Sequence, residues 1–398
     1  MKKTWVNIPD VLFFQEGPGV RNTQYTTEGV KLLNVANLVE GKVDLSTSDR
    51  YISEEEAYGK YKHFLCDTGD FIVASSGIKV EYIDKKMGFI EESMLPLCMN
   101  TSTIRFKVLD ENKLRIRYFM YYLKSQHFKG QLARAITGSA QLNYGPSHLK
   151  KMIIPLVDIS VQDEIVQQMD KVQDIIDMRQ RELSLLDDLI KARFVELFGD
   201  PATPGDKFRT CKLGEVADVK SSHRVFTTEF VDEGVPFYRG TEIGALALGY
   251  QPENPYRISM EHYLKIASDD SKPMRGDLLL PSICNKGQVW MVDTDEPFYY
   301  KDGRVLCISP NRSVLDSKYL QFYMKMRTEA EYPKLGSGST FAEFKIFQLK
   351  DLEVDIPPLN AQKSFNLFAD QVDKSKLIEA KSLNLVFSMH LRMQIFSD

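Results

Sequence analysis

The chain has 398 residues, of which 43% are hydrophobic and 27% charged, and its formal net charge is −4. These values are typical of a globular protein with more than one domain; they exclude a strongly basic protein that coats nucleic acid, but not a local basic groove. No apolar run reaches the length of about 18 residues that a membrane span needs, and MKKTWVNIPD at the N-terminus lacks the apolar region of a signal peptide.

The five cysteines are scattered along the chain and form no C-x-x-C pair. They are Cys66, Cys98, Cys211, Cys284 and Cys307. An odd number of cysteines without paired spacing predicts free thiols in a reducing compartment, so we expect the protein in the cytoplasm.

The first predicted domain covers residues 1–158. Short apolar or alternating runs, such as DFIVASS at 70–76 and STIRFKV at 102–108, are separated by Gly, Pro, Asn and Asp and indicate strands and turns. The segment LRIRYFMYYLKSQHFKGQL at 114–132 has the apolar spacing of helices instead. This half of the chain is therefore predicted to be a mixed α+β domain.

One long helix is predicted over residues 159–200. Its apolar residues recur at spacings of three, four and seven, and no Gly or Pro interrupts the segment 161–198 before GDP at 199–201 ends it. At about 1.5 Å per residue this helix spans roughly 55–60 Å. The seam residues are Ile165, Met169, Val172, Ile176 and Leu183.

The second half of the chain follows the same plan. A mixed domain is predicted over 201–358 and a second long helix over 359–398, with Phe365, Val372 and Leu383 in its apolar seam. Exposed apolar seams of this length require a partner, and the nearest candidate is the other helix. The predicted fold class is therefore α+β: two globular domains joined by two long antiparallel helices, a coiled-coil-like rod with a pseudo-twofold internal repeat.

Matching segments in the two halves support this internal repeat. EGVKLLNVANL at Glu28 resembles EGVPFYRGTEI at Glu233, and GDFIVASSG at Gly69 resembles GDLLLPSIC at Gly276. Further along, three matches share an offset of 200 residues (338 − 138, 349 − 149, 362 − 162). They pair Gly138-Ser139 with Gly338-Ser339, Leu149-Lys150 with Leu349-Lys350, and Gln162 with Gln362. Because these matches follow the same order in both halves, they indicate a duplication.

Motifs for several kinds of catalysis are missing from the sequence. There is no G-x-x-x-x-G-K-[ST] phosphate loop, and no G-x-G-x-x-G stands between a strand and a helix. The six histidines have no metal-ligand spacing and no clustered Cys or Asp partner. The sequence therefore predicts a chain that is not itself an enzyme.

The order of these parts resembles the specificity subunit of type I restriction–modification enzymes. The residues that carry the resemblance are TGSAQLN, LKKMIIPL and VQDEIV before the first helix, LLDDLIKARFVELFGDP at its end, and EGVPFYRGTEIG and RGDLLLPSICNKG in the second half. The resemblance covers the whole chain, although VFSMHLRMQIFSD at the C-terminus departs from the acidic and basic pattern of the family.

The resemblance implies a division of labour for the repeat. Residues 1–158 and 201–358 become target recognition domains, each for one half of a bipartite, asymmetric double-stranded DNA site, and the helices become a spacer that docks two methyltransferase subunits. Restriction subunits supply the motor and the nuclease of the host-defence complex, which methylates adenine. This chain then binds no cofactor, and S-adenosylmethionine, ATP and magnesium are expected on the partner subunits.

Polar residues in the loops between the matched strands are the candidates for DNA contact. Arg and Lys side chains pair with guanine edges and Asn and Gln with adenine, while other contacts to phosphate position the protein without recognising sequence. In the first half we expect Arg21, Asn22, Tyr25, Asn34, Asn37, Ser75, Ser76, Lys79, Ser139, Gln141 and Asn143. In the second half we expect Ser222, His223, Arg224, Tyr238, Arg239, Thr241, Ser282, Asn285, Lys286, Ser339 and Thr340.

Two alternatives have the same layout. The chain could be the specificity component of another restriction–modification type, with the same recognition domains and different partners. It could also be a protein-binding coiled-coil adaptor that holds two clients without DNA. Arg-bearing polar loops at matched positions in both halves favour DNA over the adaptor.

Overall fold

The computed structural model describes residues 3–136, 142–335 and 342–392, and it describes no side chain for residue 142 or for 383–392. The chain divides into two compact units: unit 1 is Met1–Arg179 with Ser382–Asp398, and unit 2 is Gln180–Lys381. The domain boundaries expected at 158, 200 and 358 remain a prediction. No helix among the described residues is long and apolar enough to cross a membrane.

Unit 1 contains a four-stranded antiparallel sheet in the order β2-β11-β7-β9 and a three-stranded sheet in the order β10-β3-β6. Three two-stranded sheets, β1-β13, β12-β8 and β4-β5, complete the unit. The strands are β1 Thr4–Asn7, β2 Leu12–Glu16, β3 Val30–Leu33, β4 Leu38–Val39, β5 Lys42–Val43, β6 Tyr51–Ile52, β7 Phe71–Ala74, β8 Ser76–Ile78, β9 Met87–Phe89, β10 Leu97–Met99, β11 Thr103–Val108, β12 Leu142–Asn143 and β13 Ile153–Leu156.

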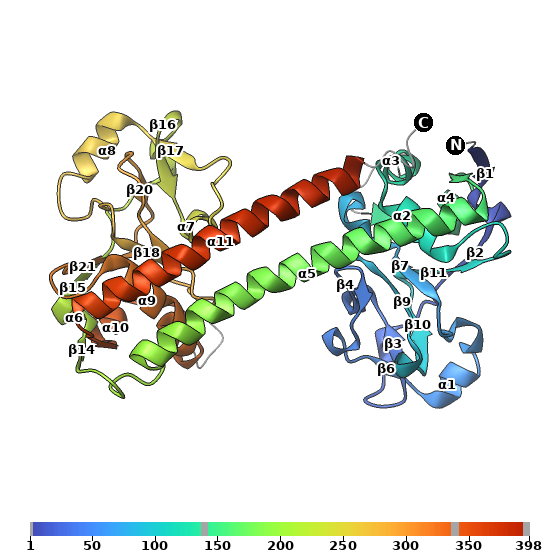
Figure 1. Cartoon of the computed structure of the whole chain (residues 1–398), viewed down its shortest axis with the longest axis horizontal. Helices are drawn as coiled ribbons and strands as arrows, with labels where there is room; N and C mark the ends of the chain where they lie inside the picture. The colour runs from blue at the N-terminus through green and yellow to red at the C-terminus, as the bar shows by residue number, and fades with distance from the viewer. Residues whose placement is uncertain (1–2, 137–141, 336–341, 393–398) are drawn as a thin grey trace. The chain divides into compact units, whose positions relative to one another are not determined.

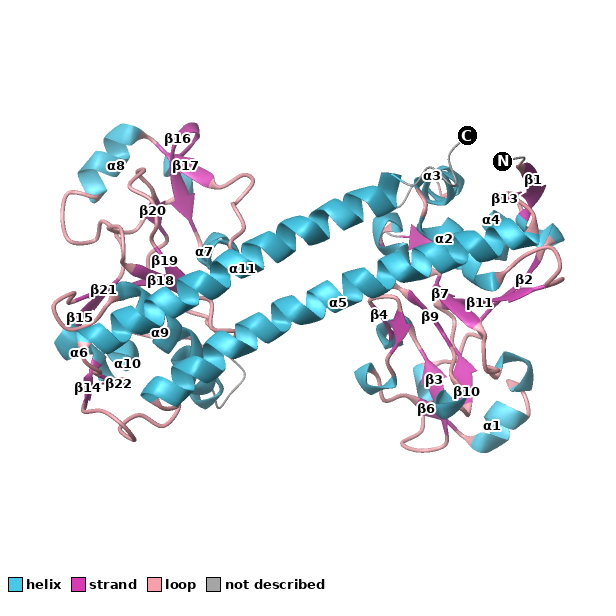
Figure 2. Cartoon of the chain, in the orientation of Figure 1, coloured by secondary structure: helices cyan, strands magenta, loops and turns pink. Residues whose placement is uncertain are grey.

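Unit 2 has the corresponding sheets, in the orders β15-β21-β18-β19, β17-β16-β20 and β14-β22. The strands are β14 Thr210–Lys212, β15 Ala217–Lys220, β16 Phe230–Tyr238, β17 Tyr256–Ile258, β18 Leu278–Pro281, β19 Trp290–Met291, β20 Tyr299–Tyr300, β21 Val305–Pro310 and β22 Glu353–Asp355. Mixed helix and sheet in both units confirms the α+β class (Figure 2).

Two helices are much longer than the rest: α5, Ile159–Phe198, has 40 residues, and α11, Leu359–Arg392, has 34 (Figure 1). The others are α1 Glu54–Tyr58, α2 Ile116–Lys124, α3 Gln126–Ala135, α4 Pro146–Leu149, α6 Leu213–Val216, α7 Gly240–Ala247, α8 Met260–Ile266, α9 Ser317–Glu331 and α10 Ile346–Asp351. GDP after α5 ends it as expected, because Gly199 takes the left-handed conformation (φ +89°) and Pro201 cannot continue a helix.

The two units share the register of their strands as well as the strand order. The offsets found in the sequence, close to 200, recur between residues that face each other across the sheets. In unit 1 the facing pairs include Ala74 with Thr103 and Leu12 with Val108, and in unit 2 Pro281 with Val305 and Ala217 with Pro310. The same residue positions therefore occupy the same places in the two sheets.

The repeated EGV motif has a steric cause. Gly29 directly precedes β3 and Gly234 lies within β16, and both have positive φ values, +121° and +150°. A Cβ on Gly29 would lie 2.3 Å from the carbonyl oxygen of Ile52, and a Cβ on Gly234 would lie 2.2 Å from that of Ile258. Only glycine avoids this clash, which explains why both copies carry it.

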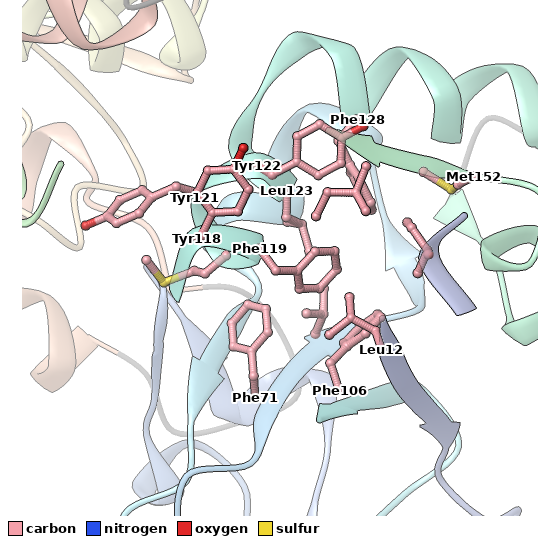
Figure 3. Close-up of a cluster of buried hydrophobic side chains, with 14 of the residues drawn as sticks. Leu12, Phe71, Phe106, Tyr118, Phe119, Tyr121, Tyr122, Leu123, Phe128 and Met152 are labelled. Carbon is pink, nitrogen blue, oxygen red and sulfur yellow. The ribbon is translucent and has the colours of Figure 1, made fainter. Parts of the chain in front are cut away.

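The core of unit 1 lies between the four-stranded sheet and α2. Phe71 on β7 and Phe106 on β11 point from the sheet toward Phe119 on α2, and Tyr118, Tyr122 and Phe128 lie beside them (Figure 3). The ring centroid of Phe119 is 5.0 Å from that of Phe106 and 6.2 Å from that of Phe71. These buried rings hold α2 on the sheet, and they exclude water from one of its faces.

The first turns of α5 are attached to unit 1 through a buried glutamine. Gln162 accepts a hydrogen bond from the Arg115 backbone N–H (2.9 Å) and donates to the carbonyls of Lys113 and Val157 (both 2.9 Å). Gln362, 200 residues later on α11, makes the same three bonds in unit 2, to the backbone of Asp316, Val314 and Pro357. The matched glutamines thus have a structural role.

The seam of α5 serves more than helix pairing, which corrects the expectation from its spacing. Ile165 and Met169 are buried in the same cluster as Tyr118 and Phe119, so they pack into the core of unit 1. This follows from their place in the first turns of α5, which lie on the unit itself. Ile176 is buried, Val172 and Leu183 are half-buried, and their partners remain a prediction; the Leu383 side chain lies outside the described residues.

In unit 2 the end of α5 does lie against the start of α11. The ring centroid of Phe365 is 5.1 Å from that of Phe194 and 5.7 Å from that of Phe198, and Val372 belongs to the same buried cluster. Further along, Asp187 on α5 forms an ion pair with Lys376 on α11. Because residue numbers fall along α5 while they rise along α11, these two segments run antiparallel within unit 2.

Candidate nucleic-acid interface

A basic pocket of about 620 Å³ lies in unit 2 between the N-terminal end of α7 and the loops that follow β18 and β20. Among the described residues, four cationic side chains and no carboxylate line it: they are Arg239, Lys286, Lys301 and Arg304. Thr241 and Ser282 also belong to its lining. The structure thus brings together predicted residues from two loops that are about 40 residues apart in the sequence (282 − 241 = 41).

Arg239 is held in a fixed orientation. Its Nε donates to Glu242 Oε2 (3.1 Å), and its Nη2 donates to Glu242 Oε1 (2.7 Å). The guanidinium lies over the ring of Tyr256, 4.6 Å from the ring centroid. Burial by itself would raise the pKa of the Glu242 carboxyl, but hydrogen bonds from Arg239 and Thr241 hold that pKa below its usual value. The ion pair therefore stays charged at neutral pH.

The other three cations of the pocket differ in how they are held. Arg304 pairs with Glu343, which the structure places outside the pocket lining. Lys286 is exposed, in the turn that follows Cys284, where its backbone N–H donates to Gln288 Oε1 (3.0 Å). Lys301 is half-buried, and its backbone N–H donates to the Tyr238 carbonyl (2.9 Å). Cations of this kind contact phosphate or guanine edges in DNA complexes.

Unit 1 has a smaller basic pocket, of about 380 Å³, at a matching place. Lys79, Lys85 and Lys86 line it, together with Val39 and Tyr82, and Glu40 forms an ion pair with Lys85 (3.2 Å). Two lining positions correspond in the repeat. These are Val39 with Gly244 (244 − 39 = 205) and Lys79 with Lys286 (286 − 79 = 207). Both units therefore present a basic pocket where the loops after β7 and β18 meet the segments after β3 and β16.

Four of the predicted DNA contacts have buried side chains, and their contact with DNA stays a prediction. Asn34 accepts from Asn100 Nδ2 (2.9 Å), and Asn37 is fully buried and donates to the Asp44 carbonyl (3.1 Å). Ser75 and Ser282 are buried at the matched ends of β7 and β18, where the carbonyl of each accepts a backbone hydrogen bond. Ser282 nevertheless belongs to the lining of the basic pocket of unit 2.

The segment with Ser222, His223 and Arg224 does not line the unit 2 pocket. Ser222 donates to the Tyr300 carbonyl (2.6 Å) and is half-buried. His223 is exposed, and its Nε2 lies 2.7 Å from Asp269 Oδ2. Hydrogen bonds from Ser271 and from His223 hold the pKa of Asp269 far below its usual value. His223 and the exposed Arg224 remain available on this surface.

The remaining predicted residues fall into three groups. Tyr238 packs against Phe298 (ring centroids 5.2 Å apart) and contributes mainly to packing. Arg21, Asn22, Tyr25, Ser76, Asn143 and Asn285 are exposed or half-buried and line neither basic pocket. Ser139, Gln141, Ser339 and Thr340 lie outside the described residues. Their contacts with DNA remain predictions.

Sequence reasoning missed several cations of the two pockets. Lys301 and Arg304 come from YKDGR before β21, which pairs with β18, and Lys85 and Lys86 come from DKK before β9, which pairs with β7. Each pair of basic residues stands directly before a strand that is a neighbour of β7 or β18. This position in the sequence is the signal that could have identified them. Among the described residues, no group of three or more His, Cys, Asp or Glu side chains could hold a metal ion.

Comparison with known proteins gives a consistent result. The family model of the type I restriction modification DNA specificity domain matches residues 23–187 and again residues 205–386. A putative type I restriction enzyme specificity subunit of Haemophilus influenzae is 25% identical over 257 residues, which is 63% of this chain and 63% of that protein. A putative type I restriction enzyme MjaX specificity subunit of Methanocaldococcus jannaschii is 22% identical over 89% of this chain and 82% of that protein.

A solved structure shares the fold. That structure concerns complex assembly and conformational transition of the type I R-M system. Its sequence is 17% identical to this chain, and the match covers 98% of this chain and 95% of that chain with a TM-score of 0.55. The match to the Haemophilus relative spans less than two thirds of that protein's length. Because the family model covers most of the chain in two consecutive matches, one in each half, this chain belongs to the type I restriction modification DNA specificity family.

Proposed function

We propose that this chain recognises a bipartite, asymmetric DNA site for a type I restriction–modification complex, with one unit for each half-site. The observation that carries the proposal is the presence of a basic pocket at a matching position in each unit. The pockets share Lys79 and Lys286 as corresponding residues, yet most of their other lining side chains differ. A common position with different side chains suits two domains that recognise two different sequences.

The long helices serve as the spacer and as the docking surface for two methyltransferase subunits. The antiparallel contact of α5 and α11 in unit 2 supports a paired rod with pseudo-twofold symmetry. A helix of 40 residues spans about 60 Å, which is long enough to bridge half-sites one helical turn of DNA, ~34 Å, apart. In this arrangement the chain sets the distance between half-sites as well as their sequence.

The chemistry belongs to the partner subunits. S-adenosylmethionine is bound by the methyltransferase subunits, which modify adenine, and ATP and magnesium serve the restriction subunits. This chain contributes binding and orientation alone, without a cofactor of its own. The formal net charge of this chain is −4, so its basic pockets supply only part of the positive charge that neutralises the DNA phosphates. The partner subunits supply the rest.

The test is co-expression with the methyltransferase subunit of the same restriction–modification system. We expect a complex with one copy of this chain and two methyltransferase subunits, which methylates adenine at a two-part site with a fixed spacer. The measurement is the mass of the complex together with sequencing of the methylated positions. Methylation by this chain alone, or a continuous site without a spacer, would contradict the proposal.

Replacing Arg239 by alanine is expected to relax recognition of one half-site only. If the guanidinium binds a guanine edge, preference at one base pair falls by ~1–3 kcal/mol; if it binds phosphate, affinity falls evenly and the salt slope drops by about one. Binding titrations against single-base variants of the site, at several salt concentrations, separate the two. Lys79→Ala, in the basic pocket of unit 1, is the control, and its effect must fall on the other half-site.

A further inference from the structure

The side edge of the Arg239 guanidinium, formed by Nε and Nη2, makes its hydrogen bonds within the protein. Nε and Nη2 each donate one N–H to the two carboxylate oxygens of Glu242, and the Glu242 side chain is only 11% exposed. The same carboxylate also accepts from the Arg239 backbone N–H (2.8 Å) and from Thr241 Oγ1 (3.0 Å). Four hydrogen bonds thus fix Glu242, which in turn fixes the plane of the guanidinium.

One face of the guanidinium is also occupied. It lies 4.6 Å from the centroid of the Tyr256 ring, and that ring is stacked on Phe230 at a centroid distance of 4.6 Å and an interplanar angle of 11°. Tyr256 is 47% exposed and comes from β17, whereas Arg239 caps α7. Two different elements therefore hold one cation in a defined plane.

Three of the five guanidinium N–H groups remain, two on Nη1 and one on Nη2. The described residues offer them no hydrogen-bond acceptor, and the Arg239 side chain is 42% exposed at the edge of the basic pocket. One N–H from each of these nitrogens forms the end-on fork that matches O6 and N7 of guanine in the major groove.

The charge of Glu242 argues for a base rather than a phosphate as the ligand. A cation that is already paired with a carboxylate gains little from a phosphate, because the carboxylate repels the phosphate and offsets the attraction. The hydrogen bonds to a guanine edge do not depend on net charge in this way, and they gain from a donor that is held in place.

From these contacts we infer that Glu242 and Tyr256 are positioning residues that hold the Arg239 fork to recognise one guanine in the half-site of unit 2. This inference rests on the proposed function and narrows it to a base and a residue set. The corresponding position in unit 1 is Asn34, which is buried and bonded to Asn100, so the device is expected in one half-site only.

The test compares the wild-type complex with Glu242→Gln and Tyr256→Leu, in the assembly with methyltransferase subunits. Glutamine keeps the shape of Glu242 but loses its charge and one of its two acceptor oxygens. We expect preference for one G·C pair in one half-site to fall by about tenfold or more, while affinity for unrelated DNA rises in Glu242→Gln because a negative charge is removed. Tyr256→Leu should relax the same base pair without raising affinity for unrelated DNA.

Lys301→Ala is the matched control, since Lys301 lines the same pocket and has no carboxylate partner among the residues that the structure describes. It should weaken binding evenly across sequences, with a salt slope lower by about one. If Glu242→Gln and Tyr256→Leu both keep the base preference of the wild type, the inference is overturned. The same holds if their only effect is a lower melting temperature. A wild-type complex without a bipartite site would instead overturn the proposed function, so the two failures are distinguishable.

Discussion

Phe365→Ala is expected to lower the free energy of unfolding of unit 2 by about 3–5 kcal/mol, the usual cost of removing a buried phenylalanine ring. Phe365 is 1% exposed, and its ring lies within 5.1–5.7 Å of Phe194, Phe198 and Phe322, measured between centroids. Alanine would leave a cavity where α5, α9 and α11 meet, and the surrounding rings could fill it only in part. Chemical denaturation of the full-length chain, followed by circular dichroism, measures the loss.

Leu367→Ala is the control on the same helix, because Leu367 is 66% exposed. Its effect should stay within about 0.5 kcal/mol, as for surface positions in general. A small effect at Phe365 equal to that at Leu367 would mean that α11 does not pack into unit 2 in solution. Specific DNA binding provides a second measurement. Phe365→Ala should weaken recognition of the half-site of unit 2 more than that of the half-site of unit 1.

The duplication could be predicted from sequence because its matches mark positions with steric or hydrogen-bond requirements. Gly29 and Gly234 stand where a Cβ would clash with a carbonyl, and Gln162 and Gln362 each satisfy three backbone groups. Such requirements allow few substitutions, so the residues match at a nearly constant offset. The strands between them match only in their apolar character, and their register could not be derived from sequence.

The candidate site could be predicted only in part, because exposure depends on tertiary structure. Asn34 and Arg239 hold the same position in the repeat, yet Asn34 is turned into the interior by Asn100 while Arg239 remains at a pocket. A polar residue in a loop gives no sign of this difference. Lys301 and Arg304 were missed because they reach the pocket through the pairing of β21 with β18, which brings together segments distant in sequence.

The helix seam illustrates the same limit. A spacing of three and four residues predicts an apolar face but does not identify what covers it. Ile165 and Met169 are covered by the core of unit 1, and Phe365 is covered by α5 and α9 in unit 2. Both outcomes satisfy one pattern, so an interpretation based on helix pairing alone was too narrow.

Gln162→Met and Gln362→Met are expected to destabilise the chain by several kcal/mol each. Methionine has a similar length and no hydrogen-bonding amide, so each substitution leaves one backbone N–H and two carbonyls without their partner. Every such group that stays buried costs about 1–3 kcal/mol. Both glutamine side chains are fully buried, which limits the access of water to these groups. Gln168→Met, at an exposed position on α5, is the control.

The two substitutions should act on different units, since Gln162 bonds within unit 1 and Gln362 bonds within unit 2. Hydrogen exchange followed by mass spectrometry locates the loss, because amides of the destabilised unit exchange faster while those of the other keep their protection. In the complex with methyltransferase subunits, each variant should then lose discrimination in its own half-site. Equal loss of protection in both units from either substitution would mean that the chain unfolds as one cooperative body. The matched glutamines would then stabilise the whole chain, and the recognition of one half-site could not be weakened without the other.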